Sequence, residues 1–147
     1  MGDEQGQTGW QIELYQDEQG QRPVQTYVDA LPEEVRRRFQ TRVQYLIAEG
    51  LNVSQETAKK LETDLWELRL PHSDGNPRIL FFASIGKRIV LLHGFNKQGK
   101  ATDKVPESEK LIARKRRDDF IARDELEQAK LAEKTSKARG GKKGKRK

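Results

Sequence analysis

The stretch LWELRLPHSDGNPRILFFASIGKRIVLLHGF, residues 65–95, decides the fold. Apolar and polar residues alternate in Leu65–Leu70, which is the period of a strand with one buried face. Two further apolar runs, Arg78–Ala83 and Arg88–Phe95, are separated by a short glycine-containing link, and this spacing predicts an antiparallel hairpin. The segment Pro71–Pro77 is dense in turn formers and predicts a loop. We therefore expect three consecutive strands of one sheet.

Patterns of helical period lie on both sides of these strands. The apolar residues between Pro32 and Gly50 recur on one helical stripe, so a long helix is expected there. A short helix is expected over Val24–Ala30, and alternation in Trp10–Tyr15 predicts a first strand. A second long helix is expected to begin at Pro106. Its expected buried residues are Leu111, Ile112, Phe120 and Ile121.

The order of the expected elements is strand, helices, three strands and helix. Helices that are segregated from a small, mainly antiparallel sheet define an α+β domain and argue against a doubly wound one. The sequence contains no glycine-rich phosphate loop and no dinucleotide-binding fingerprint. We therefore expect a small α+β domain without a nucleotide cofactor.

The composition narrows the class of protein further. The chain has 147 residues, of which 33% are hydrophobic and 35% charged, and it has no cysteine. A disulfide scaffold, a thiol nucleophile and a sulfur-ligated zinc site are therefore excluded, and we expect no metal or other cofactor. No apolar run approaches the ~20 residues that a membrane helix needs. Residues 1–9 lack the apolar core of a secretory signal, so we expect a cytoplasmic protein with no membrane partner.

The formal net charge is +6, and it is distributed unevenly over three segments of the chain. Residues 1–58 carry 5 basic and 10 acidic side chains, residues 59–123 carry 15 and 9, and residues 124–147 carry 9 and 4. The end of the chain, Lys130–Lys147, opposes nine Lys and Arg residues to the single Glu133. Such a segment cannot offset the entropy of ordering itself, and we expect disorder beyond about residue 135. It is also of the kind that attracts polyanions without sequence specificity.

Cations near the ends of the expected strands are candidates for binding phosphate. They are Arg69, Arg78, Lys97 and Lys100. If the three strands pair in sequence order, these side chains converge on one face of the sheet, where arginine would donate two parallel hydrogen bonds to a phosphate. An alternative stays open, in which the arginines pair with Glu67 or Asp74 and serve only the fold.

The two histidines are weaker candidates. His93 follows the alternation of its strand and is expected on the same side as Ile89, Leu91 and Phe95, which is typical of a histidine at the edge of the core. His72 lies in the proline-bounded loop and is freer to titrate near neutral pH. Neither histidine belongs to a catalytic order of residues that the sequence supports.

The ordered pieces LWELRL (65–70), NPRILFF (76–82), RIVLLHGFNKQGK (88–100) and VPESEKLIARKRRDDF (105–120) resemble the phage-related HigB-like branch of the RelE toxin superfamily. The similarity covers about Trp10–Arg123. It implies the RelE-like, microbial-ribonuclease-type fold and a toxin of a type II toxin–antitoxin pair. Toxins of this superfamily enter the ribosomal A site and cut mRNA without a metal, through attack of the ribose 2′-hydroxyl on the adjacent phosphate.

The resemblance also implies roles for particular residues. Arg69, Arg78 and Lys97 match the catalytic cations of the family. The RNA-binding residues that we expect beside them are Lys100, Lys104 and His93. Where some relatives have a tyrosine or histidine near the C-terminal helix, this chain has Phe120, which cannot transfer a proton, so the general base is unassigned.

The domain boundaries and partners follow from the same resemblance. We expect a flexible N-terminus over residues 1–9, a toxin domain over 10–123, and a helical extension over 124–147 that runs into a disordered basic tail. The expected partners are a helix-turn-helix antitoxin, the ribosome and mRNA, with operator DNA bound only through the antitoxin complex. Two alternatives stay open: a catalytically weak or inactive RNA- or ribosome-binding protein of the same fold, and an interaction module whose cations neutralise an acidic partner.

Overall fold

A computed structural model describes residues 9–72, 75–99 and 104–146, with side chains through Ala138. The chain divides into two units, Met1–Arg116 and Arg117–Lys147. The first unit contains the sheet, and the second unit is helical. None of the described helices is both long and apolar enough to cross a membrane.

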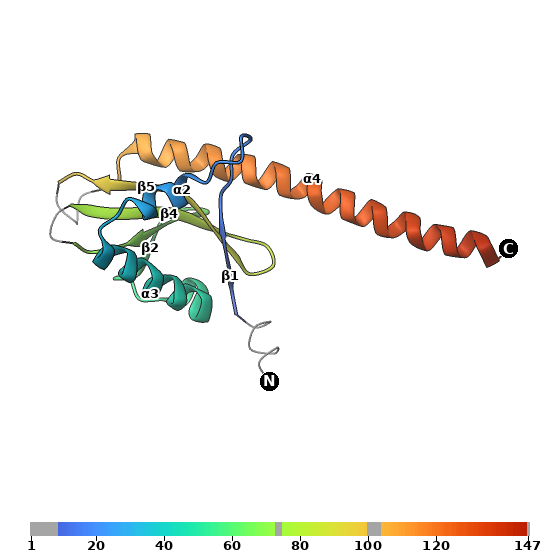
Figure 1. Cartoon of the computed structure of the whole chain (residues 1–147), viewed down its shortest axis with the longest axis horizontal. Coiled ribbons are helices and arrows are strands. Elements are labelled where there is room, and N and C mark those ends of the chain that lie inside the picture. Colours follow the sequence, from blue (N-terminus) through green and yellow to red (C-terminus); the bar gives the residue numbers. More distant parts are fainter. Residues whose placement is uncertain (1–8, 73–74, 100–103, 147) are drawn as a thin grey trace. The chain divides into compact units, whose positions relative to one another are not determined.

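The first unit is built on a five-stranded sheet with the order β1-β5-β4-β3-β2 (Figure 1). Strand β1 pairs parallel with β5, and the other neighbours are antiparallel. The strands are β1 (Gln11–Leu14), β2 (Ala58–Glu62), β3 (Leu65–Arg69), β4 (Asn76–Ser84) and β5 (Arg88–Lys97). The predicted α+β class, the mainly antiparallel sheet and the β4–β5 hairpin are confirmed.

Strand β2 was not predicted from the sequence. Ala58 is its one fully buried residue, whereas Lys59 and Lys60 are exposed. Because β2 lies at the edge of the sheet, adjacent lysines are tolerated there and discourage pairing with another chain. An edge strand of this kind lacks the alternation that reveals a half-buried strand.

The helices begin close to the residues that the sequence indicates, and α3 also ends where expected. They are α2 (Pro23–Asp29), α3 (Glu33–Glu49), a short 3-10 helix over Gly50–Asn52, and α4 (Glu107–Arg146). Helix α3 follows Pro32 directly and ends at Gly50, which has a φ of 61°. A Cβ atom at Gly50 would lie 2.3 Å from the Trp10 indole, so this glycine also permits the close packing of the first strand.

The core lies between the sheet and helices α2 and α3. Leu68, Ile79 and Phe81 of the sheet are fully buried there and pack with Val24 of α2 and Val35 of α3. Alternate residues of the same strands, among them Leu80 and Phe82, therefore lie on the opposite face of the sheet.

The buried face of α4 differs from the prediction. Leu111 and Ile112 are 47% and 37% exposed, whereas Ala113 is fully buried. Ala113 lies four residues after Glu109 and three before Arg116, and both of these contact His93 of β5. The stripe of α4 that meets the sheet is thus small and polar, and a search for large apolar residues selects the wrong side of the helix. Phe120 and Ile121 belong to the second unit.

The expected position of His93 is also wrong. The register between β4 and β5 shifts between Leu80 and Phe81, so that Phe81 is opposite Leu91 and Leu80 is opposite His93. Leu92 is the extra residue of this bulge, and it turns the remainder of β5 over. His93 and Phe95 therefore lie on the face opposite that of Leu91 and the core.

In the second unit, α4 continues as a helix through Arg146. It extends beyond residue 135, where the composition predicts that order ends. Residues 125–138 are exposed along this helix, and Lys137 pairs with Glu133 at 3.3 Å. The division into residues 1–9, 10–123 and 124–147 stays a prediction.

Candidate functional site

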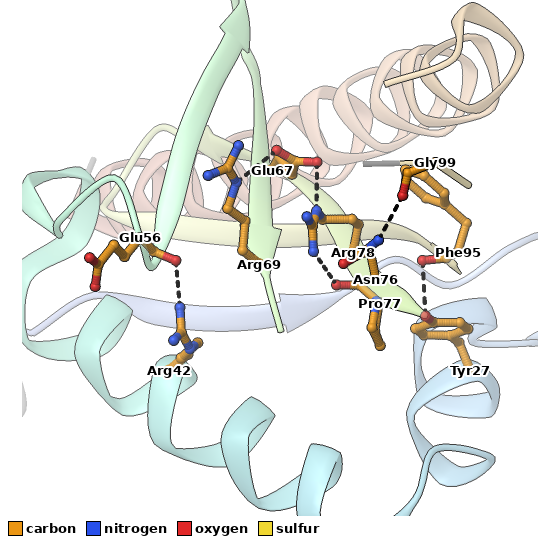
Figure 2. Close-up of polar contacts among 10 residues, drawn as sticks. All are labelled: Tyr27, Arg42, Glu56, Glu67, Arg69, Asn76, Pro77, Arg78, Phe95 and Gly99. Carbon is orange, nitrogen blue, oxygen red and sulfur yellow. Dashed lines mark hydrogen bonds and ion pairs between the residues drawn. The ribbon is translucent and has the colours of Figure 1, made fainter. Parts of the chain in front are cut away.

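Two arginines meet on one carboxylate at the point where β3 ends and β4 begins. Arg69 and Arg78 are opposite each other in the register of β3 and β4. Glu67 accepts a hydrogen bond from Arg69 Nε at 3.3 Å on Oε1 and one from Arg78 Nε at 3.0 Å on Oε2 (Figure 2). The expected convergence of Arg69 and Arg78 is therefore present, and so is their pairing with Glu67, which the sequence left open as an alternative.

The two arginines differ in exposure. Arg78 is 2% exposed, and its Nη1 donates to the Pro77 carbonyl at 3.1 Å. Burial lowers the pKa of the Arg78 guanidinium, and the charge of Glu67 opposes that shift. The Arg69 side chain is 25% exposed, and among the described residues no acceptor is found for its two Nη groups. Arg78 is thus held inside the protein, and Arg69 has a donor fork available to a ligand.

Arg69 opens onto a basic hollow of about 280 Å³. We define this basic hollow by its lining residues: Lys59, Lys60, Leu61, Glu67, Arg69, Lys104, Val105 and Lys110. Five of these side chains are cationic, and one is a carboxylate. Cations at this density around a concavity favour the binding of a polyanion.

Three of the lining lysines were missed in the sequence. Lys59 and Lys60 lie on the unpredicted strand β2, and Lys110 lies in the first turn of α4. Arg114 of α4 donates to both oxygens of Glu62 at the end of β2, at 2.7 and 2.8 Å. This bidentate pair joins the start of α4 to the edge strand, which brings the lysines of both elements to one place.

The remaining predicted cations have different surroundings. Lys97 is opposite Asn76 in the register, on the same face as Arg78, and it is 3% exposed. Lys104 is exposed and lines the basic hollow. Lys100 lies outside the described residues.

Neither histidine lines the basic hollow. His93 Nε2 lies 2.7 Å from Glu109 Oε1, and Arg116 Nη1 lies 3.3 Å from its Nδ1. Burial lowers the pKa of His93, and Glu109 opposes that shift. His72 Nε2 lies 2.9 Å from Glu34 Oε1 on helix α3. Each histidine therefore connects a strand or loop to a helix in this structure.

Hydrogen bonds to backbone carbonyls hold the segments that flank the two arginine-bearing strands, β5 beside β4 and the residues before β2 beside β3. Tyr27 of α2 donates through its hydroxyl to the Phe95 carbonyl at 2.9 Å, and Arg42 of α3 donates to the Glu56 carbonyl at 2.6 Å (Figure 2). Burial raises the pKa of Tyr27 to about 12, so its hydroxyl stays protonated near neutral pH. Both helices of the core face thus fix the backbone beside the two arginines.

A protein-family model matches the part of the chain that carries this site. The model of the family described as phage-derived protein Gp49-like (DUF891) matches residues 26–118, which include every residue that lines the basic hollow. No curated protein matches the chain. The match spans more than half of the sequence, and the chain therefore belongs to the phage-derived Gp49-like family, a family of the RelE-like toxin type.

Proposed function

We propose that this chain is the toxin of a type II toxin–antitoxin pair and that it cuts mRNA on the ribosome, with RNA phosphate bound in the basic hollow. Membership of a toxin–antitoxin-like family implies an antitoxin partner. The ribosome, mRNA and the helix-turn-helix class of antitoxin belong to the proposal, as does the HigB-like branch. The observation that carries it is the Arg69 donor fork at the wall of a hollow lined by four lysines.

The chemistry of that wall suits a phosphodiester. A guanidinium donates two parallel hydrogen bonds to phosphate oxygens, and the lysines add point charges for the neighbouring phosphates. In the proposed reaction the ribose 2′-oxygen attacks phosphorus as its proton leaves. The bond to the 5′-oxygen breaks, and that oxygen takes up a proton. The products are a 2′,3′-cyclic phosphate and a 5′-hydroxyl.

The cations accelerate this reaction only if they bind the pentacoordinate phosphate more strongly than the ground-state diester. We assign contact with the scissile phosphate to Arg69. Arg78 and Lys97, also predicted as catalytic, are buried and would act from within the sheet. The general base stays unassigned.

Two observations favour a second function. The chain lacks a proton-transfer residue at Phe120, and both histidines are engaged with glutamates of α4 and α3. A protein with this site that binds RNA or the ribosome without cutting would retain the basic hollow and lose only the chemistry.

The test begins with induction of the full chain in cells without its antitoxin. We expect growth arrest and inhibition of translation, and we expect Arg69→Ala to abolish both. The matched control is Arg37→Ala, which removes a 72% exposed arginine of α3 and its pair with Glu33. Persistent arrest in a folded Arg69→Ala variant would contradict the proposed site.

Primer extension on mRNA from the induced cells separates the two functions. New internal 5′ ends that require Arg69 support cleavage. Arrest without such ends supports a protein that only binds RNA or the ribosome.

A further inference from the structure

We propose that Glu67 is the positioning residue of the basic hollow: its carboxylate holds Arg69 and Arg78 side by side and turns the outer edge of Arg69 toward the ligand. This inference rests on the proposed function for its meaning. Its principal readout is RNA binding, which does not require cleavage.

Bringing the two arginines together costs free energy. Arg69 and Arg78 are register partners, so their Cα atoms are only about 5 Å apart and their charges repel. Arg78 is also 2% exposed, and a buried charge is costly unless it is paired and hydrogen-bonded. Glu67 is 1% exposed and lies between them, so a single anion offsets both costs.

Glu67 contacts the two arginines from a defined direction. Glu67 meets both guanidinium groups at Nε, with Oε1 for Arg69 and Oε2 for Arg78 (Figure 2). Contact at Nε occupies the inner edge of a guanidinium and leaves the Nη edge for another acceptor. Arg69 is one of the residues that line the basic hollow, and we place this outer edge at its wall. Glu67 thereby orients Arg69 without using its bidentate donors.

Glu67 also lowers the net positive charge of the cluster. Two arginines and one glutamate carry a net charge of +1, and loss of the carboxylate raises it to +2. Glu67→Gln should therefore strengthen the electrostatic attraction of RNA. It should also release Arg69, because the glutamine NH₂ cannot accept a bond from the second Nε. The buried Arg78 would retain the remaining oxygen, since it cannot reach water.

The experiment measures binding of a fluorescein-labelled single-stranded RNA of mixed sequence to the full chain by anisotropy over a range of salt concentrations. For Glu67→Gln we expect the slope of log Kd against log salt to steepen by about 0.7, the value for one additional phosphate contact on a single strand. We expect mRNA cutting in induced cells to fall roughly 100-fold, as misplacement of a contact group does. A residue that served only the fold would weaken binding and cutting together.

A second variant covers the case in which Glu67→Gln fails to fold. Glu67→Met combined with Arg78→Met removes the buried charge together with its partner, leaves Arg69 Nε without an oxygen at position 67, and restores the net charge of +1. We expect a salt slope like that of the wild type, with cutting still lost because Arg69 has no anchor. Recovery of cutting in this double variant would overturn the proposal, since Glu67 would then only neutralise Arg78.

The matched control is Glu13→Gln, which removes a carboxylate from Arg88 at 3.4 Å on the β1 and β5 strands. Neither slope nor cutting should change in this control. A slope in Glu67→Gln equal to that of the wild type would overturn the inference. If the wild type itself does not cut mRNA, the proposed function fails, whereas the salt slopes still decide the role of Glu67.

Discussion

The two faces of the sheet carry different kinds of side chain, although the same strands form both. On the face toward α2 and α3, Leu68, Ile79 and Phe81 are fully buried among hydrocarbon side chains. On the opposite face, β4 is apolar at Leu80 and Phe82 but begins with Arg78, which pairs with Glu67. The difference shows that burial of apolar side chains on the first face stabilises the fold. This stabilisation offsets the cost of holding two like charges close together on the second face.

The largest change in the free energy of unfolding should come from a substitution on the apolar face. Phe81 is fully buried and stacks on Trp66 with ring centroids 6.2 Å apart. Phe81→Ala should lower the free energy of unfolding by about 3–5 kcal/mol, because it removes a large side chain and leaves a cavity. Urea denaturation followed by circular dichroism measures this loss. Ile85→Ala, at a position 76% exposed, is the control and should cost little.

A smaller effect is expected where α2 crosses β5. A Cβ atom at Gly94 would lie 2.3 Å from Cδ2 of Tyr27, so Gly94→Ala must displace that ring. The expected loss in the free energy of unfolding is about 1–3 kcal/mol, the usual cost of overpacking. The double variant with Tyr27→Ala should be no less stable than Tyr27→Ala alone, because the clash is gone. Additive losses would mean that Gly94 matters for another reason.

The next effect is a pH dependence of the free energy of unfolding, and it comes from His93 on the opposite face. Because the pKa of His93 is lowered in the folded protein, the unfolded chain binds its proton more readily. Its contribution to stability is therefore complete above the unfolded pKa of about 6.5 and declines as the pH falls below it. Urea unfolding at pH 7.5 and pH 5.5 should show a larger decrease for the wild type than for His93→Gln. Equal decreases would show that the burial of His93 does not set this dependence.

The smallest effect on stability, with a clear effect on binding, is expected at the edge strand. Lys59→Gln combined with Lys60→Gln should change the free energy of unfolding by no more than about 0.5 kcal/mol, since both residues are exposed. The slope of log Kd for RNA against log salt should become shallower by about 0.7 for each lost phosphate contact. Lys115→Gln, an exposed lysine of α4 outside the basic hollow, should leave the slope unchanged.

Most of the fold was predictable because its signals are local. Alternation in β3, the hairpin of β4 and β5, and the stripe of α3 between Pro32 and Gly50 each follow from residues close together in sequence. Strand β2 was not predictable in this way, because an edge strand with Lys59 and Lys60 needs no apolar alternation.

The candidate site was predictable in part. The sequence indicated Arg69, Arg78, Lys97 and Lys100 as phosphate-binding candidates, with Lys104 expected to bind RNA beside them. It also indicated Glu67 as a rival partner for the arginines. It contained no sign that Lys110 of α4 and the lysines of β2 line the same hollow. That arrangement depends on the pair between Arg114 and Glu62, which are 52 residues apart.

The amino-acid sequence by itself determined the class of fold, the starts of the two long helices, the end of α3 and the types of charge available to a ligand, because propensity and periodicity act over a few residues. The tertiary structure alone decided which charges meet. The bulge at Leu92 turned His93 away from the core face, and strand pairing set Arg69 beside Arg78 on the carboxylate of Glu67. Register depends on how two strands pair. One extra residue in a strand moves each side chain after it to the other face of the sheet.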